Sequence, residues 1–270
     1  HDIAINDFVL TGGSKRGWIA SLTATQDKRV TAIIPMVADF LNLGETIKHL
    51  LNVYPEGNSV ISGYLHLPLK ETFAQSEMQQ LISMIDPFQY RSDLTIPKYI
   101  ISASGDEIIP SDTNKLSFSE LPGKKWMRVL PNQGHNIMRD DKELVTDLTE
   151  SFYGALVENR ELPDIDWELN GDLLEITSSL APKEAWLWQA TNTSDRDFRY
   201  LASVEHLSDF SRSSINIKCS QQNCTNTLML PESDQGWTAS FIELHFDNSP
   251  YADLVLTTRV FVLPDRYQGQ

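Results

Sequence analysis

The chain of 270 residues lacks an excess of positive charge, a long apolar run and more than two cysteines. Its 22 lysines and arginines are outnumbered by 37 aspartates and glutamates. The net charge of −15 argues against nucleic acid and against an anionic membrane surface as partners. No apolar stretch approaches the roughly 20 residues of a membrane-spanning helix. The histidines and cysteines show no metal-ligand spacing, so we expect no metal and no other cofactor.

The two cysteines, Cys219 and Cys224, lie close together in a polar segment. A disulfide that closes this short loop would suit an oxidising compartment. Two free thiols on a loop are the alternative, and the spacing does not decide between them.

The first 162 residues alternate apolar runs with helical patterns. A short strand is predicted at 8–10, and strands that are buried on both faces are predicted at 30–37, 97–104 and 126–130. Amphipathic spacing predicts helices over 18–26 and 139–159. This alternation indicates an α/β fold with a mostly parallel sheet. Residues 38–96 are too many for a plain crossover and contain helix-like segments at 44–53 and 70–85, so we expect a cap or lid there.

The pattern changes after residue 162. Runs with period-two alternation, separated by turn residues, occupy 173–177, 185–188, 198–204, 237–246 and 254–263. Several short strands of this kind predict a small β-sandwich of immunoglobulin or fibronectin type. We therefore divide the chain into an α/β domain over 1–162 and a β-sandwich over 163–270.

The most informative motif is Gly12-Gly13-Ser14, which follows the first apolar run and precedes a helical pattern. A strand, a tight turn and a helix in this order form a nucleophile elbow, which holds the serine hydroxyl clear of its backbone. Arg16 stands where the common pattern has glycine, and a simple glycine-rich turn is the alternative. Only thirteen residues precede Ser14, whereas hydrolases of this architecture place several strands there. We expect the chain to be the C-terminal portion of a longer protein.

A serine nucleophile needs a base to take its proton and an acid to orient that base. The chain supplies Ser14, Asp106 and His135 in the order that α/β hydrolases use, each beside the end of a predicted strand. Glu107 and Asp112 are close enough in sequence to compete with Asp106 for the role of the acid. The sequence predicts a serine triad of Ser14, Asp106 and His135.

Two basic residues, Lys15 and Arg16, follow the serine directly. The backbone N–H of Lys15 is the expected oxyanion-hole donor. The two side chains could bind an anionic group of a substrate; for Arg16 we favour a structural role, paired with an acid such as Asp39.

The strand at 8–10 is expected to be an exposed apolar edge of the sheet, because no earlier strand is present to cover it. Such edges aggregate unless they are paired. We predict that this edge pairs with an N-terminal fragment or with a second copy of the chain.

The chain resembles the PhoPQ-activated pathogenicity-related protein family of the α/β-hydrolase superfamily. The strings that carry the resemblance lie at 11–18, 27–30, 34–39, 86–90, 104–107, 187–191, 196–199, 236–239 and 257–260. The resemblance implies an α/β-hydrolase fold, export to the periplasm or the outside, a link to virulence, and a triad at Ser14, Asp106 and His135. Arg16 is the form that the family carries, and family members have a long N-terminal portion that this chain lacks.

The predicted function is therefore hydrolysis of an ester or peptide bond through an acyl-enzyme. The alternative is a non-enzymatic secreted effector that uses a hydrolase scaffold for binding, as the autocrine proliferation repressors in the family suggest. A β-module for substrate binding, fused to an inert α/β spacer, is a third and weaker interpretation.

Overall fold

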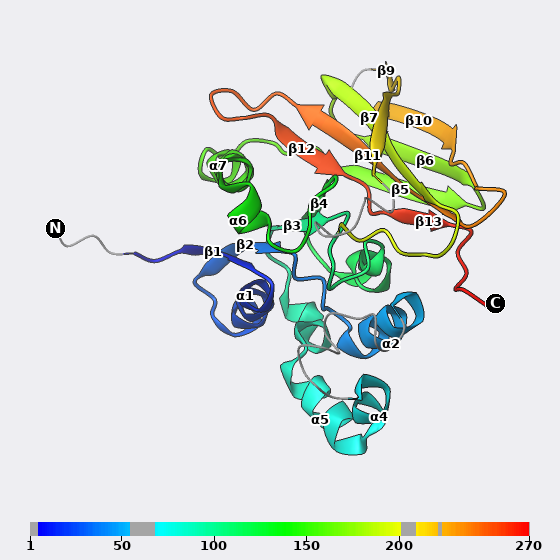
Figure 1. Cartoon of the computed structure of the whole chain (residues 1–270). Coiled ribbons are helices and arrows are strands. Elements are labelled where there is room, and N and C mark those ends of the chain that lie inside the picture. Colours follow the sequence, from blue (N-terminus) through cyan, green and yellow to red (C-terminus); the bar gives the residue numbers. More distant parts are fainter. Residues whose placement is uncertain (1–4, 55–67, 201–208, 221–222, 270) are drawn as a thin grey trace.

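A computed structural model describes residues 5–54, 68–200, 209–220 and 223–269 (Figure 1). The helices of this part are α1 (Lys15–Gln26), α2 (Leu43–Val53), α4 (Leu69–Ala74), α5 (Ser76–Ile85), α6 (Ile137–Asp140) and α7 (Lys142–Val157). Short 3-10 turns lie at Pro87–Asp93, Thr113–Leu116 and Phe118–Glu120. The strands are β1 (Phe8–Gly13), β2 (Val30–Met36), β3 (Lys98–Ala103), β4 (Lys125–Leu130), β5 (Ile165–Asn170), β6 (Leu173–Ser178), β7 (Glu184–Asn192), β8 (Ser211–Ser214), β9 (Lys218–Ser220), β10 (Asn223–Met229), β11 (Trp237–Phe246), β12 (Leu254–Thr257) and β13 (Phe261–Leu263).

The first four strands form one parallel sheet in the order β1-β2-β3-β4. Every residue of β3 is buried, and in β2 only the second residue is exposed. This burial explains why these strands read as continuous β-branched and apolar runs. All four strands that the sequence predicts in the first 162 residues are confirmed.

Two of the predicted helices are broken. The helix expected over 139–159 is divided into α6 and α7, because Asp141 caps the second of them and its side chain accepts the N–H of Leu144 at 3.0 Å. The helix expected over 70–85 is divided into α4 and α5 at Gln75, whose backbone is extended. The helix expected over 44–53 is α2, which begins one residue earlier.

The C-terminal β region, residues 165–263, contains two antiparallel sheets. One has the order β5-β6-β10-β9, and the other has the order β12-β11-β7-β8 with β13 paired to β11. Buried residues of both sheets, such as Leu174 and Ile242, belong to one hydrophobic cluster. The strand predicted at 198–204 is wrong for 198–200, which form no strand, and its remaining residues lie outside the described part. The run 254–263 forms two strands, β12 and β13, rather than one.

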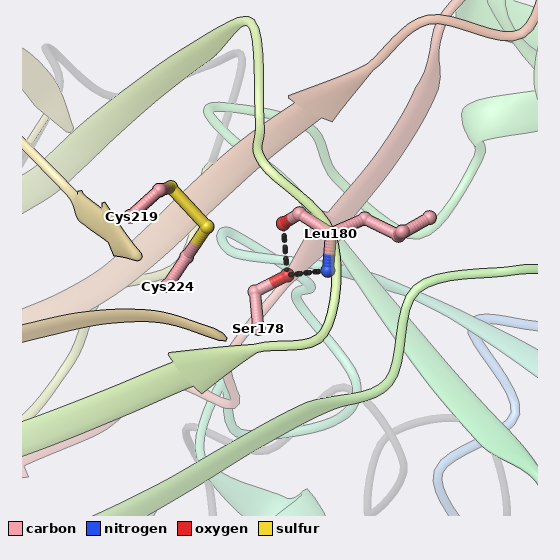
Figure 2. The surroundings of a disulfide bond; sticks show 4 residues. All are labelled: Ser178, Leu180, Cys219 and Cys224. Atoms are coloured by element: carbon pink, nitrogen blue, oxygen red, sulfur yellow. Dashed lines mark hydrogen bonds between the residues drawn. A yellow bond between two sulfur atoms is a disulfide. The ribbon is translucent and has the colours of Figure 1, made fainter. Parts of the chain in front are cut away.

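Cys219 and Cys224 form a disulfide with an S–S distance of 2.07 Å (Figure 2). The two residues lie opposite each other in the pairing of β9 with β10. Beside them Ser178, which pairs with Cys224 across β6 and β10, bonds through its hydroxyl to the carbonyl of Leu180 at 2.7 Å. The disulfide alternative of the sequence is the one that the structure adopts.

The C-terminal β region packs against the β4 side of the parallel sheet, and β1 lies at the opposite edge (Figure 1). The backbone N–H of Val129 on β4 donates to the hydroxyl of Thr257 on β12 at 2.9 Å. The hydroxyl of Tyr99 on β3 donates to the carbonyl of Val255 at 2.7 Å. Tyr99 belongs to a hydrophobic cluster that contains residues of both regions. No helix among the described residues has the length and apolar character needed to cross a bilayer.

Candidate active site

Ser14 occupies the turn between β1 and α1, where its backbone adopts φ 54° and ψ −128°. A non-glycine residue seldom adopts a positive φ, and such strain persists only where the surrounding structure enforces it. The Ser14 N–H donates to the carbonyl of Met36 on β2 at 2.8 Å, which fixes the turn against the sheet. The strand, turn and helix around Ser14 have the form of a nucleophile elbow.

Glycine on both sides of Ser14 lets the strand and helix approach each other. A Cβ on Gly12 would lie 2.8 Å from the Cβ of Arg16, and a Cβ on Gly17 would lie 2.6 Å from the Gly12 carbonyl oxygen. Gly12 therefore makes room for Arg16, which explains how this elbow tolerates a large residue where the common pattern has glycine.

The structure corrects the pairing that the sequence suggested for Arg16. The Arg16 residue is exposed and forms no ion pair with the described residues. Asp39 bonds instead to the side chains of Ser102 and Asn114, which bond to each other at 3.0 Å. Lys15 is also exposed, and its N–H is in the first turn of α1, where helical N–H groups have no partner within the helix. The assignment of Lys15 as oxyanion donor stays a prediction.

Asp106 and His135 are brought together by the loops that follow β3 and β4. The carboxylate Oδ2 of Asp106 and the imidazole Nδ1 of His135 are 2.8 Å apart. The other carboxylate oxygen accepts the N–H groups of Ile108 and Ile109, at 2.8 and 3.0 Å. Asp106 is 3% exposed, so backbone donors and the imidazole replace water around its charge.

The two other acids that the sequence left open have different partners. Glu107 accepts the backbone N–H of His135 at 2.7 Å and so fixes the loop rather than the ring. Asp112 is buried and bonds to His49 at 2.8 Å and to Arg196 at 2.8 Å. Of the three acids, Asp106 is the one that contacts the His135 ring.

The site shifts the pKa of two of its groups. Burial lowers the pKa of His135, but the hydrogen bond to Asp106 and the charges of Asp106, Glu107 and Asp39 outweigh it and raise the pKa above the ordinary 6.5. Burial raises the pKa of Asp39 to about 7, although hydrogen bonds from Ser102 and Asn114 lower it. Asp39 therefore changes its charge near neutral pH, and it lies beside the Asp106–His135 pair.

Ser14, Asp39, Asp106 and His135 follow β1, β2, β3 and β4 respectively, so all four lie at the carboxyl edge of one parallel sheet. Functional groups of open α/β sheets gather at this edge. The Ser14 hydroxyl forms no hydrogen bond to a described residue, whereas His135 and Asp106 are in direct contact. Hydrogen bonds of catalytic groups are often long before a substrate binds.

Sequence reasoning missed two residues around this site, Asn132 and Tyr200, and it gave Asp39 and Glu107 other partners than those in the structure. Their roles come from contacts between loops that are distant in sequence. Of the residues that were missed, only Asn132 carried a usable signal. It lies two residues after β4, and asparagine is enriched at positive φ. The φ of Asn132 in the structure is 55°. Among the described residues, no group of three or more His, Cys, Asp or Glu side chains could hold a metal ion.

Comparison with known proteins relates the chain to one family. The family model of PhoPQ-activated pathogenicity-related proteins matches residues 1–199. Autocrine proliferation repressor protein A of Dictyostelium discoideum is 27% identical over 283 aligned residues, which cover 96% of this chain and 56% of that protein. The chain thus spans a little over half the length of this relative.

Two solved structures are similar at low identity. Acylaminoacyl peptidase of Pyrococcus horikoshii gives a TM-score of 0.44 at 14% identity, over 59% of this chain and 25% of that chain. Acetyl xylan esterase 1 of Thermoanaerobacterium sp. JW/SL YS485 gives 0.40 at 19% identity, over 56% of this chain and 47% of that chain. The predicted architecture is confirmed by the structure itself: a four-stranded parallel sheet with flanking helices precedes two antiparallel β sheets.

Proposed function

Since the chain belongs to the PhoPQ-activated pathogenicity-related protein family, we propose that its parallel sheet carries the active site of a serine hydrolase. One observation carries the proposal: an Asp106–His135 pair and a strained Ser14 turn lie at the same edge of one sheet. A serine hydroxyl, an imidazole and a carboxylate in such an arrangement suit acyl transfer.

In the proposed mechanism Ser14 attacks the carbonyl carbon of an ester or peptide. His135 takes the hydroxyl proton through Nε2 and then donates it to the leaving group. Asp106 accepts a hydrogen bond from the Nδ1–H of His135 and stabilises the imidazolium that forms. The backbone N–H of Lys15 donates to the oxyanion of the tetrahedral intermediate. In the second half of the reaction, His135 takes a proton from a water molecule, whose oxygen attacks the acyl carbon. The bond to Ser14 then breaks, the carboxylic acid leaves, and His135 returns the proton to the Ser14 oxygen.

The surroundings of the site suggest how a substrate enters. The exposed cations Lys15 and Arg16 are adjacent to Ser14 and suit an anionic group on the substrate. Segment 38–96, which carries α2, α4 and α5, is proposed as the cap. The aromatic rings of Trp18 and Phe40 lie 6.5 Å apart, and both pack against a cluster of buried residues from α2 and α5. This contact joins the helix that follows the nucleophile to the proposed cap.

We also propose that the protein is exported, to the periplasm or beyond, and takes part in virulence. The disulfide between Cys219 and Cys224 supports export, since disulfides persist in oxidising compartments. The description of the family supports a role in pathogenicity.

Intact-mass spectrometry with a fluorophosphonate probe tests the hydrolase proposal. We expect one covalent adduct on the wild-type chain, none on Ser14→Ala, and one on the matched control Ser119→Ala, whose serine is exposed elsewhere on the surface. An adduct that survives in Ser14→Ala would place the reactive residue elsewhere. No adduct on the wild type would contradict an assembled triad in this chain.

A second candidate is a secreted effector that binds its target without chemistry. The name of the Dictyostelium discoideum relative favours it. In an assay of cell proliferation an effector would keep its activity in Ser14→Ala, whereas a hydrolase would lose it.

A further inference from the structure

The loop that carries the catalytic acid is bonded to the C-terminal β region. The N–H of Tyr200 donates to the carbonyl of Gly105, the residue before Asp106, at 2.7 Å. Gly105 in turn donates its N–H to the carbonyl of Gln133, two residues before His135, at 3.0 Å. The acid loop therefore lies between the histidine loop and a segment of the β region.

The histidine loop is bonded to the β region as well. The Asn132 side chain accepts the N–H of Phe210 at 2.7 Å and donates to the Phe210 carbonyl at 2.9 Å. The Asn132 N–H donates to the hydroxyl of Ser104 at 2.9 Å. One asparagine with positive φ thus joins the histidine loop, the acid loop and the β region.

Both contacts are close, and buried aromatic rings of the β region lie beside them. A Cβ on Gly105 would lie 2.6 Å from the Cβ of Tyr200, so the two backbones approach as closely as glycine allows. Phe198 and Phe210 are each 4% exposed, and their rings lie 6.3 Å apart. The Phe210 ring also lies 5.5 Å from Phe241 on β11. Phe210 is therefore anchored in the hydrophobic core, and so is Phe198, two residues before Tyr200.

We propose that the C-terminal β region is a structural part of the catalytic site, and that Asn132 is a positioning residue that acts through His135. All three predicted triad residues lie in the first 162 residues, yet the loops of two of them are set by residues 200 and 210. The catalytic consequence rests on the function proposed above, whereas the placement of His135 does not.

The ionisation of His135 reports its placement directly. The charged groups that face its imidazole are Asp106, Glu107 and Asp39. Its hydrogen bond to Asp106 depends on the alignment of two loops, and a loosened loop weakens that bond. Since burial alone lowers the pKa of an imidazole, a weakened bond lowers the pKa of His135.

The test is an NMR titration of the histidine ring signals in the full chain, with His135 assigned by the His135→Asn variant. Asn132→Gly keeps a residue suited to positive φ but removes both bonds to Phe210. Asn159→Gly is the matched control, because Asn159 also has positive φ (52°) and is exposed after α7. We expect the pKa of His135 to fall by about half a unit or more in Asn132→Gly and to stay unchanged in Asn159→Gly. An unchanged pKa in a folded Asn132→Gly would overturn the proposal.

A second pair of variants tests the other contact and covers a failure of Asn132→Gly to fold. Gly105→Ala forces Tyr200 away, whereas Gly44→Ala on α2 meets no atom within 4 Å. We expect the pKa of His135 to fall only in Gly105→Ala, and an equal pKa in both variants would overturn the proposal.

Fluorophosphonate labelling of the same proteins separates this inference from the proposed function. If wild type is labelled, we expect Asn132→Gly to react about tenfold to a hundredfold more slowly than Asn159→Gly. If no protein is labelled but the pKa of His135 falls as stated, the hydrolase proposal fails and the positioning role stands.

Discussion

The choice among three neighbouring acids depends on a single contact. Asp106 contacts the His135 ring, while Glu107 contacts only the backbone of that residue. Asp106→Asn leaves an amide that can donate to Nδ1 and so favours the wrong tautomer of His135. We expect a fall of about ten-thousandfold in the rate of fluorophosphonate labelling, because an asparagine in this role has that effect in serine proteases. Glu107→Gln keeps a carbonyl oxygen for the His135 N–H and should lose about tenfold or less. Equal losses in both variants would contradict the assignment.

The pH dependence of labelling should reflect the shifted groups. His135 acts as a base only when neutral, so the labelling rate rises as pH increases through its pKa, which lies above 6.5. Asp39 becomes negative near pH 7 and then favours protonated His135. Asp39→Asn should therefore move the midpoint of the profile to lower pH, while Asp172→Asn, in the β5–β6 turn, should not. A midpoint that stays in place or rises in Asp39→Asn would contradict this coupling.

Ser14, Asp106 and His135 could be placed at one sheet edge from the sequence, because each stands beside the end of a predictable strand. The positions of the strand ends do not predict whether the side chains of Arg16 and Asp39 form an ion pair. It depends on the direction of two side chains around a turn, and Gly12 turns out to accommodate Arg16 on the outer surface. Loop-to-loop contacts such as Asn132 with Phe210 leave no local pattern, because the residues are 78 positions apart.

Among helices and strands, hydrophobic periodicity located the elements but not their breaks. A single helix was predicted from the apolar residues that share one face, Leu144, Leu148, Phe152 and Leu156. Asp141 caps the N-terminus of α7, so this helix begins at Lys142 and is separate from α6. The short strands β8 and β9 were missed, because all of their residues are exposed. The strand β10 was missed as well, because only Cys224 of its seven residues is buried. Periodicity is informative only where one face is buried.

The strand β1 forms one edge of the parallel sheet, and we expect the chain to associate with another strand there. Within the described part of the chain β1 pairs only with β2. Exposed apolar side chains lie on the two helices nearest this edge, Ile19 on α1 and Val157 on α7, which are 52% and 59% exposed. Unpaired strand edges with apolar surroundings associate. We expect this chain to form a dimer through β1, and in a longer chain the same edge to accept a preceding strand.

Sedimentation velocity tests the dimer. A double variant with Ile19→Lys and Val157→Lys should raise the dissociation constant by about tenfold or more, because each ammonium would have to lose water on association. Met229→Lys is the matched control, since Met229 is 69% exposed on β10, far from β1. A wild-type chain that stays monomeric at high concentration would rule out pairing with a second copy.

At the scale of the whole molecule, buried residues of the two regions belong to one hydrophobic cluster. Buried residues of β2, β3 and α7 join residues of β6, β11 and β12 in one cluster. The division at residue 162 marks a change of strand pattern, and as a domain boundary it stays a prediction. Sequence alone could show the change of period, but it could not show which faces of the two regions become one core.

A buried ion pair at this junction should govern the stability of the whole chain. Arg128 on β4 bonds to Glu243 on β11, and both side chains are less than a tenth exposed. Glu243→Gln leaves the Arg128 charge buried without its counter-charge. We expect the free energy of unfolding at pH 7 to fall by about 3–5 kcal/mol. Glu175→Gln, on the exposed face of β6, should change it by less than about 0.5 kcal/mol.

The pH dependence of the stability loss in Glu243→Gln shows how much of that loss is electrostatic. Burial alone would raise the pKa of Glu243, but His245 and Arg128 lower it to about 2 from an ordinary 4.5. A lowered pKa stabilises the fold above the unfolded value of 4.5, and that stabilisation is lost as pH falls from 4.5 toward 2. Urea unfolding should therefore show the gap between wild type and Glu243→Gln narrowing below pH 4.5. A gap that stays constant to pH 2 would mean that shape and packing, rather than the charge of Glu243, join the two regions.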